Sequence, residues 1–151
     1  MGMYTELNLG VNFRKDTPQN IIDILKYMLG DSPVRFEYIK PQLPEHPLFE
    51  TERWAIMLVC DSYYFDGQTD SSIHYDDISE SYYLNVRCNL KNYSSEIEHF
   101  LSFIQPYLYT DGFIGYTRYE EDDDPTLIYN TPKGIELRWI NGKHTMLEDY
   151  L

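Results

Sequence analysis

The chain has few of the residues from which catalytic and metal sites are usually built. Only two of its 151 residues are cysteines, and both Cys60 and Cys88 fall inside apolar runs, which predicts buried, inert thiols and no disulfide framework. No two of the four histidines lie three or four residues apart, as a helical zinc pair requires; they are His46, His74, His99 and His144. Nucleophile-elbow, phosphate-loop and dinucleotide glycine motifs are also absent. We therefore expect no cofactor, no metal site and no catalytic residue that the sequence alone would identify.

Basic residues and long apolar runs are also scarce. Twelve Lys and Arg oppose 25 Asp and Glu, and the resulting formal net charge of −13 repels the phosphate backbone of nucleic acids. No run approaches the ~20 apolar residues that span a bilayer, and the first residues lack the basic and hydrophobic regions of a secretory leader. We expect a cytoplasmic protein whose partner is neither a nucleic acid nor a membrane.

Acidic residues are plentiful and unevenly placed. Residues 45–81 hold nine acids and a single base, Arg53. Their spacing fails the calcium-loop template, which needs oxygen ligands at alternate positions, then a glycine and a closing glutamate. The five acids at 120–124 are interpreted as a solvated hairpin tip. We predict that the acid-rich segment at 45–81 attracts a basic protein partner, held by its densest group of carboxylates: Asp61, Asp66, Asp70, Asp76 and Asp77.

A faint internal repeat is the main architectural signal. The sequence LNLGVNFR at 7–14 returns as LNVRCNLK at 84–91, and each copy alternates between apolar and polar residues as a strand does. An amphipathic helix pattern follows each copy. The first helix is expected to be capped by Asp16 or Thr17, and the second by Ser94 or Ser95.

Further strand patterns complete the predicted sheet. A continuously apolar run at 54–60 is typical of a strand covered on both faces. Two βαβ units with right-handed crossovers form a four-stranded antiparallel sheet with both helices on one face, so the chain resembles ferredoxin-like folds, here extended by a C-terminal β-meander. The other predicted strands are at 4–14, 82–91, 113–119, 126–130, 135–140 and 143–147.

These elements predict a single α+β domain over residues 1–151. The length suits one hydrophobic core, and no low-complexity linker interrupts the chain. Within this domain the repeat halves cover about 4–60 and 82–120, and a C-terminal β-hairpin extension covers 126–147.

The repeat also predicts an unusual sheet face. If the strands of the two copies are neighbours, their polar sides form one surface rich in asparagine, whose amide both donates and accepts hydrogen bonds. This surface is a candidate site for a peptide, a ligand or a second sheet. The alternatives are an ordinary wet face and a face covered by the chain's own C-terminal segment. The candidate binding residues are Asn8, Asn12, Asn85, Arg87 and Asn89.

Three functions remain open at this point. The favoured one is a non-enzymatic, acidic protein-interaction module that binds or neutralises a basic protein. The second is a small-molecule-binding protein or enzyme with a pocket over the asparagine-rich face. The third is a structural homo-oligomer whose contact uses the segment 54–65 and the aromatic C-terminal strands. The chain holds fifteen tyrosines, and tyrosine suits both sheet packing and interfaces.

Overall fold

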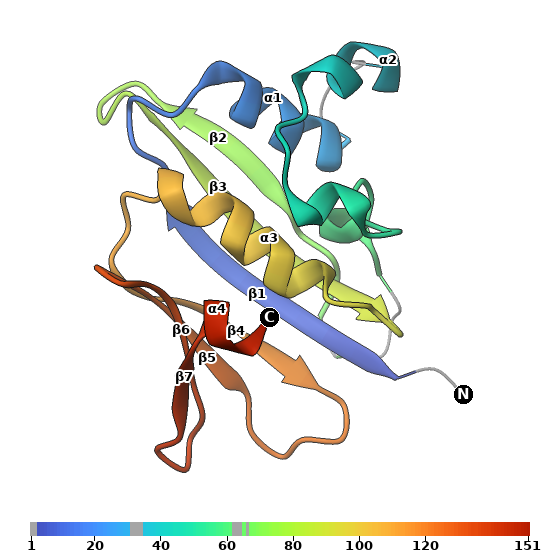
Figure 1. Ribbon diagram of the computed structural model, residues 1–151, viewed down its shortest axis with the longest axis vertical. Helices are drawn as coiled ribbons and strands as arrows, with labels where there is room; N and C mark the ends of the chain where they lie inside the picture. Colours follow the sequence, from blue (N-terminus) through green and yellow to red (C-terminus); the bar gives the residue numbers. More distant parts are fainter. Residues whose placement is uncertain (1–2, 31–34, 62–64, 66) are drawn as a thin grey trace.

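The computed structural model describes residues 3–30, 35–61, 65 and 67–151, which form an α+β fold built on one antiparallel sheet (Figure 1). The strands are β1 (Tyr4–Asn12), β2 (Ser72–Asp76), β3 (Ser81–Lys91), β4 (Gly112–Tyr119), β5 (Thr126–Thr131), β6 (Gly134–Arg138) and β7 (His144–Met146). The α-helices are α1 (Gln19–Met28), α2 (Phe36–Ile39), α3 (Glu96–Ile104) and α4 (Leu147–Tyr150). Four 3₁₀ helices connect them: η1 (Lys40–Gln42), η2 (Pro47–Glu50), η3 (Met57–Val59) and η4 (Gln105–Tyr107).

The seven strands lie in the order β2-β3-β1-β4-β5-β6-β7, and every neighbouring pair is antiparallel. The predicted α+β class and antiparallel sheet are therefore confirmed. The two repeat strands, β1 and β3, are neighbours in the middle of this sheet. Leu9 lies opposite Val86, and each side chain is only 2% exposed.

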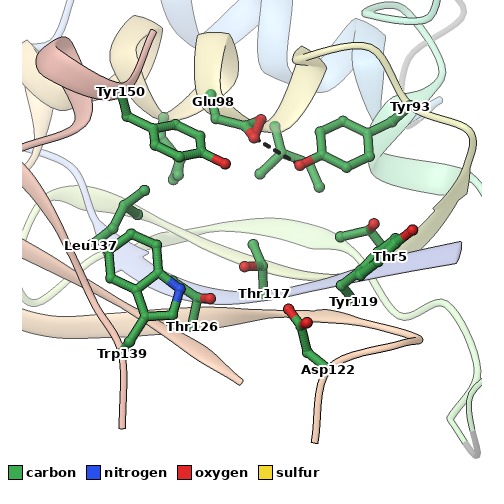
Figure 2. Close-up of a pocket in the computed structure, with 12 residues that line it drawn as sticks. Thr5, Tyr93, Glu98, Thr117, Tyr119, Asp122, Thr126, Leu137, Trp139 and Tyr150 are labelled. Atoms are coloured by element: carbon green, nitrogen blue, oxygen red, sulfur yellow. Dashed lines mark hydrogen bonds between the residues drawn. The ribbon is translucent and has the colours of Figure 1, made fainter. Parts of the chain in front are cut away.

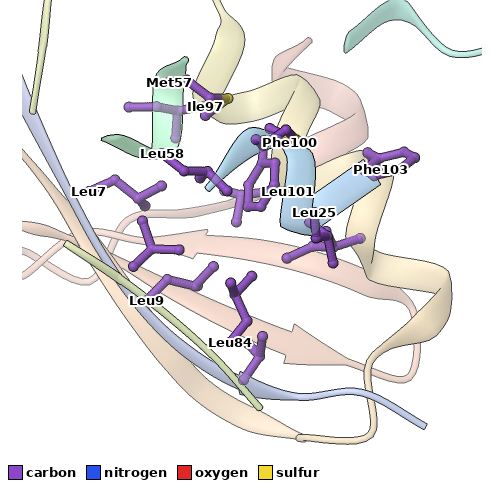
Figure 3. Packing of buried hydrophobic residues seen from close by; sticks show 14 of the residues in the cluster. Leu7, Leu9, Leu25, Met57, Leu58, Leu84, Ile97, Phe100, Leu101 and Phe103 are labelled. Atoms are coloured by element: carbon purple, nitrogen blue, oxygen red, sulfur yellow. The ribbon is translucent and has the colours of Figure 1, made fainter. Parts of the chain in front are cut away.

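Helices α1 and α3 pack over the same face of the sheet (Figures 1 and 3). The odd-numbered apolar residues of β1, such as Leu7 and Leu9, alternate towards this side and are buried against Leu25 of α1 and Phe100 of α3. Burying these side chains supplies the main hydrophobic stabilisation of the fold. No helix in the described part of the chain is long and apolar enough to cross a membrane.

The predicted helix caps are wrong. Helix α1 follows Pro18, and no side chain caps it, because Asp16 instead forms an ion pair with Arg14 and the Thr17 hydroxyl donates to the Arg14 carbonyl. Ser95 precedes α3 with a φ of 69°, outside the extended region in which a serine hydroxyl reaches the first-turn amides. The Glu96 carboxylate accepts from the Ser94 amide at 2.6 Å, outside the helix, and no described side chain caps the first-turn amides of α3.

The strand predicted at 54–60 is also wrong. These residues form turns and the short helix η3, and the outer strand of this half of the sheet is β2 at 72–76. An apolar run reports burial but not backbone conformation, and Trp54, Met57 and Leu58 are indeed buried. The chain itself covers these three residues, whereas Ile56 and Val59 of the same run are exposed. The repeat half at 4–60 lacks its predicted final strand.

The C-terminal strands follow the prediction more closely. Strands β4 to β7 form an antiparallel meander that extends the sheet beyond β1, and α4 closes the chain beside β6 and α3. The turn at Asn141 and Gly142 joins β6 to β7, and Gly142 has a φ of 92°, which glycine adopts without strain. In Figure 1 this meander curls away from the central strands below α3.

Candidate functional site

The carboxylates predicted to bind a basic partner lie in two separate places. Asp61 accepts a hydrogen bond from the Thr69 amide at 3.2 Å, and Asp70 donates its own amide to the Arg87 carbonyl. Asp76 and Asp77 lie at the turn between β2 and β3. Asp66 is outside the described residues.

The positions along β3 show how far apart these two groups are. Asp70 is hydrogen-bonded at Arg87, whereas Asp76 pairs with Ser81. Six strand residues separate these points, which corresponds to about 20 Å. Asp76 also accepts from the Ser79 amide at 2.8 Å, and this bond holds the pKa of the Asp76 carboxyl below its usual value. The four predicted carboxylates among the described residues thus do not form one cluster, and the role of the whole group in partner binding stays a prediction.

The predicted asparagine-rich face is present, and part of it is buried. The register places Asn8 opposite Arg87 and brings Asn12, Asn85 and Asn89 to the same side of the sheet, away from α1 and α3. Asn12 and Asn89 are nevertheless buried. Asn12 accepts from the Ser81 hydroxyl at 3.1 Å. The Asn89 amide donates to the Cys60 carbonyl, so residues before β2 lie beside Asn89, whereas Asn12 lies beside Ser81.

A buried glutamate lies on the same face of the sheet and escaped the sequence analysis. Glu6 is 0% exposed, and its Oε2 lies 3.5 Å from Nη2 of Arg87 and 3.4 Å from Nη2 of Arg118. The Phe65 ring centroid is 4.5 Å from the Arg118 guanidinium carbon. Gly67 lies directly against Arg87, since a Cβ there would be 1.9 Å from Nη2. In sequence, Glu6 is an ordinary polar residue of an alternating strand, so no local signal distinguishes it.

A pocket opens on the helical side of the sheet, between α3, α4 and the strands β4 to β6 (Figure 2). Its volume is about 290 Å³. Helix α3 contributes Ile97, Glu98 and Leu101 to the wall, and Thr5 and Thr117 contribute hydroxyl groups from β1 and β4. The pocket is therefore mixed in character, with an apolar back wall and several polar groups.

Glu98 is the unusual group in this pocket. It is 9% exposed, and its Oε1 accepts a hydrogen bond from the Tyr93 hydroxyl at 2.7 Å. Its Oε2 is buried and has no hydrogen-bond partner among the described residues. Burial raises the pKa of Glu98, although the bond from Tyr93 opposes this, and burial followed by the charge of Glu98 raises the pKa of Tyr93.

Aromatic rings and a second carboxylate complete the pocket. Tyr93, Tyr119, Trp139 and Tyr150 surround the space, and Asp122 extends into it from the connection between β4 and β5 (Figure 2). Burial raises the pKa of the Tyr119 hydroxyl, and so do the charges of the neighbouring acids, Asp122 among them. No lysine, arginine or histidine is among the described residues that line the pocket.

The sequence offered only weak signals for this site. Glu98 interrupts the apolar stripe of the second helix, which is also what a solvent-facing residue does. The acids at 120–124 were correctly placed on an exposed hairpin tip, but their position beside a pocket depends on how the meander curls. In the described part of the chain no three His, Cys, Asp or Glu side chains gather as a metal site requires.

Comparison with family models, with curated proteins and with solved structures found no match to this chain. The site is accordingly interpreted from its own geometry and charge.

Proposed function

We propose that the protein is a non-enzymatic, acidic interaction module whose partner is a protein with a basic surface. The chain carries a formal net charge of −13, and oppositely charged surfaces accelerate association. The carboxylates between residues 45 and 81 remain the proposed contact, and among the described members of its predicted aspartate group Asp70 and Asp77 are exposed. The proposal extends to both groups of carboxylates, because a long basic surface can reach two places about 20 Å apart.

The distribution of ion pairs is the observation that carries this proposal. Five basic side chains are already engaged with acids of the same chain: Arg14 with Asp16, Lys15 with Glu80, Arg87 and Arg118 with Glu6, and Arg138 with Glu136. Much of the positive charge is thus neutralised internally. The acids on the loops remain in excess at the surface, so the field that a partner meets is negative.

The test begins with the partner that co-purifies with the chain from cells and measures its association rate by stopped flow. At low ionic strength Asp70→Asn/Asp77→Asn is expected to slow association several-fold while changing dissociation little. The effect should diminish near physiological ionic strength, where the Debye length is about 8 Å. The matched control is Glu37→Gln/Asp111→Asn, which removes the same charge from exposed positions outside 45–81.

Association that is independent of salt and unaffected by Asp70→Asn/Asp77→Asn would contradict the proposal. Equal slowing by the control pair would show that net charge acts and that the segment at 45–81 does not. A small-molecule-binding function is the second candidate, favoured by the Glu98 pocket, which lies on the helical side of the sheet and not over the asparagine-rich face.

We also infer that the strands β2, β3, β1 and β4, together with α1 and α3, constitute a ferredoxin-like unit. The support is their order in the sheet and the position of one helix after each repeat strand. An experimental structure in which residues of the two repeat copies do not superimpose as strand and helix would contradict the duplication.

A further inference from the structure

We propose that the Glu98 pocket binds an alkylammonium group, supplied either by a free small molecule or by a lysine side chain. This proposal does not depend on a basic partner contacting residues 45–81. A site for such a group needs negative charge, aromatic faces and a limited volume, and the pocket offers each of these through different residues.

The first argument is the incomplete hydrogen bonding of Glu98. Buried polar atoms are nearly always paired, and leaving one unpaired is costly for stability. Oε1 has the Tyr93 hydroxyl, but Oε2 has no partner among the described residues. An ammonium N–H would supply both the missing donor and the missing positive charge. A neutral apolar occupant would leave Oε2 unpaired, and an anion would be repelled.

The second argument is the arrangement of the aromatic rings. Figure 2 shows Tyr93 and Tyr150 beside Glu98, with Trp139 and Tyr119 across the space from them. The faces of such rings carry negative electrostatic potential and attract ammonium groups, most strongly when the cation is desolvated. Rings on opposite sides of the space allow one cation to contact several of them.

The third argument is the charge at the mouth of the pocket. Asp122 lines the pocket and belongs to the run of acids at 120–124. No lysine, arginine or histidine is among the described residues that line the pocket with Asp122, and Lys143 and His144 line a separate hollow of about 490 Å³ together with Trp139 and Tyr150. The entrance beside Asp122 is therefore negative, and this field draws in cations and repels anions.

The volume sets the size of the occupant. A pocket of about 290 Å³ is just below the range of about 300–1,000 Å³ typical of small-molecule sites. One alkylammonium group or the end of one lysine side chain suits this space. A dinucleotide-sized or lipid-sized ligand does not.

The experiment uses the indole N–H signals of the full-length protein in ¹H–¹⁵N NMR spectra. Trp139 lines the pocket, whereas Trp54 is buried in the core and serves as an internal control. The probes are n-butylammonium with the uncharged butan-1-ol, and N-acetyl-lysine amide with N-acetyl-norleucine amide. The cationic member of each pair is expected to shift the Trp139 signal in a saturable way, with the Trp54 signal unchanged. The cationic probe that binds more tightly identifies the source of the group.

Matched variants locate the binding. Glu98→Gln keeps the shape and is expected to weaken binding of the cationic probes about tenfold. Asp122→Asn should weaken it several-fold, while Asp123→Asn, the same change one residue further along the exposed loop, should have little effect. Tyr150→Leu, at an exposed position on α4, provides a second variant that keeps the fold and loses an aromatic face. An unchanged Trp54 signal shows that each variant is folded.

Three results would overturn the proposal. The first is equal shifts with charged and uncharged probes, which would indicate a merely apolar hollow. The second is no shift of the Trp139 signal at millimolar probe concentrations. The third is binding that Glu98→Gln and Asp122→Asn leave unchanged. In each case a basic partner could still bind at 45–81, so failure here is distinguishable from failure of the proposed function.

Discussion

Glu6 and Glu98 are both buried glutamates on opposite sides of one sheet, and the protein surrounds them differently. Glu6 lies between Arg87 and Arg118 on the side away from the helices. Glu98 lies on the helical side, where a tyrosine hydroxyl is its hydrogen-bond donor and no described base lines the same pocket. One carboxylate is neutralised by cations of its own chain, and the other is not.

This difference separates a structural charge from a candidate ligand site. At the Glu6 site, Phe65 and Gly67 lie against the two arginines, whose side chains remain partly exposed. The Glu98 pocket has an opening and aromatic walls. One carboxylate oxygen of each glutamate, Oε1 of Glu6 and Oε2 of Glu98, has no hydrogen-bond partner among the described residues, so the two sites differ in the counter-charge and in the accessible space. Burial of an acid is therefore a poor guide to function by itself. Incomplete compensation of the charge beside an accessible cavity is the better guide.

The largest expected effect tests how much more the helical side contributes to stability than the other side. Leu9→Ala removes a buried side chain and leaves a cavity, so it should lower the free energy of unfolding by about 2–4 kcal/mol. Asn12→Ala, on the opposite face, loses the bond from the Ser81 hydroxyl and should cost about 1 kcal/mol. Urea unfolding monitored by circular dichroism measures both. Equal losses would mean that the two faces contribute alike.

The next effect tests whether Glu6 is needed to neutralise the two arginines. Glu6→Ala leaves Arg87 and Arg118 as uncompensated neighbours and should cost about 1–3 kcal/mol, less than for a fully buried pair because both arginines are partly exposed. Adding Arg118→Met to this variant should recover part of the loss by removing one unpaired charge. If the double variant is less stable than Glu6→Ala, the arginine contributes mainly through its contact with Phe65.

The comparison of the two faces also shows what sequence reasoning could reach. The alternation of β1 and β3 predicted their pairing and the burial of Leu9 and Val86, because a period of two residues directly reports a strand with one buried side. The run at 54–60 misled, because a continuously apolar sequence occurs both in covered strands and in turns, and here Ile56 and Val59 are exposed. The candidate site depends on long-range packing, which places the 120–124 tip beside α3, and local patterns do not contain that information.

A smaller effect concerns the pH dependence that Glu98 should impose. Burial raises the pKa of Glu98 in the folded protein, so the folded state favours the protonated carboxyl. The stability that this protonated form contributes is complete below the unfolded-state pKa of about 4.3 and is lost as the pH rises through the folded-state pKa. Tyr93, Glu96 and His99 are the other titratable groups that act on it. Glu98→Gln should remove this loss and gain up to about 1 kcal/mol at neutral pH relative to pH 4. If the difference in stability between Glu98→Gln and the parent chain is the same at pH 4 and at neutral pH, Glu98 ionises as an exposed acid does.

The smallest expected effect has the opposite sign and comes from the turn between β2 and β3. The Ser79 amide holds the pKa of Asp76 below its usual value, so the ionised carboxylate stabilises the fold above the unfolded value of about 3.9. This contribution is lost as the pH falls through the lower folded pKa. Asp76→Asn keeps an oxygen that can accept from the Ser79 amide and removes the charge, so it should be slightly less stable than the parent chain at pH 7 and equal to it in strong acid. Thermal unfolding across the acid range measures the difference, with Asp77→Asn as the control one residue further along the same turn. If Asp77→Asn shows the same pH profile of thermal unfolding as Asp76→Asn, general charge repulsion governs this turn. The pH dependence of Glu98 would then need the same charge-matched control before it is assigned to burial.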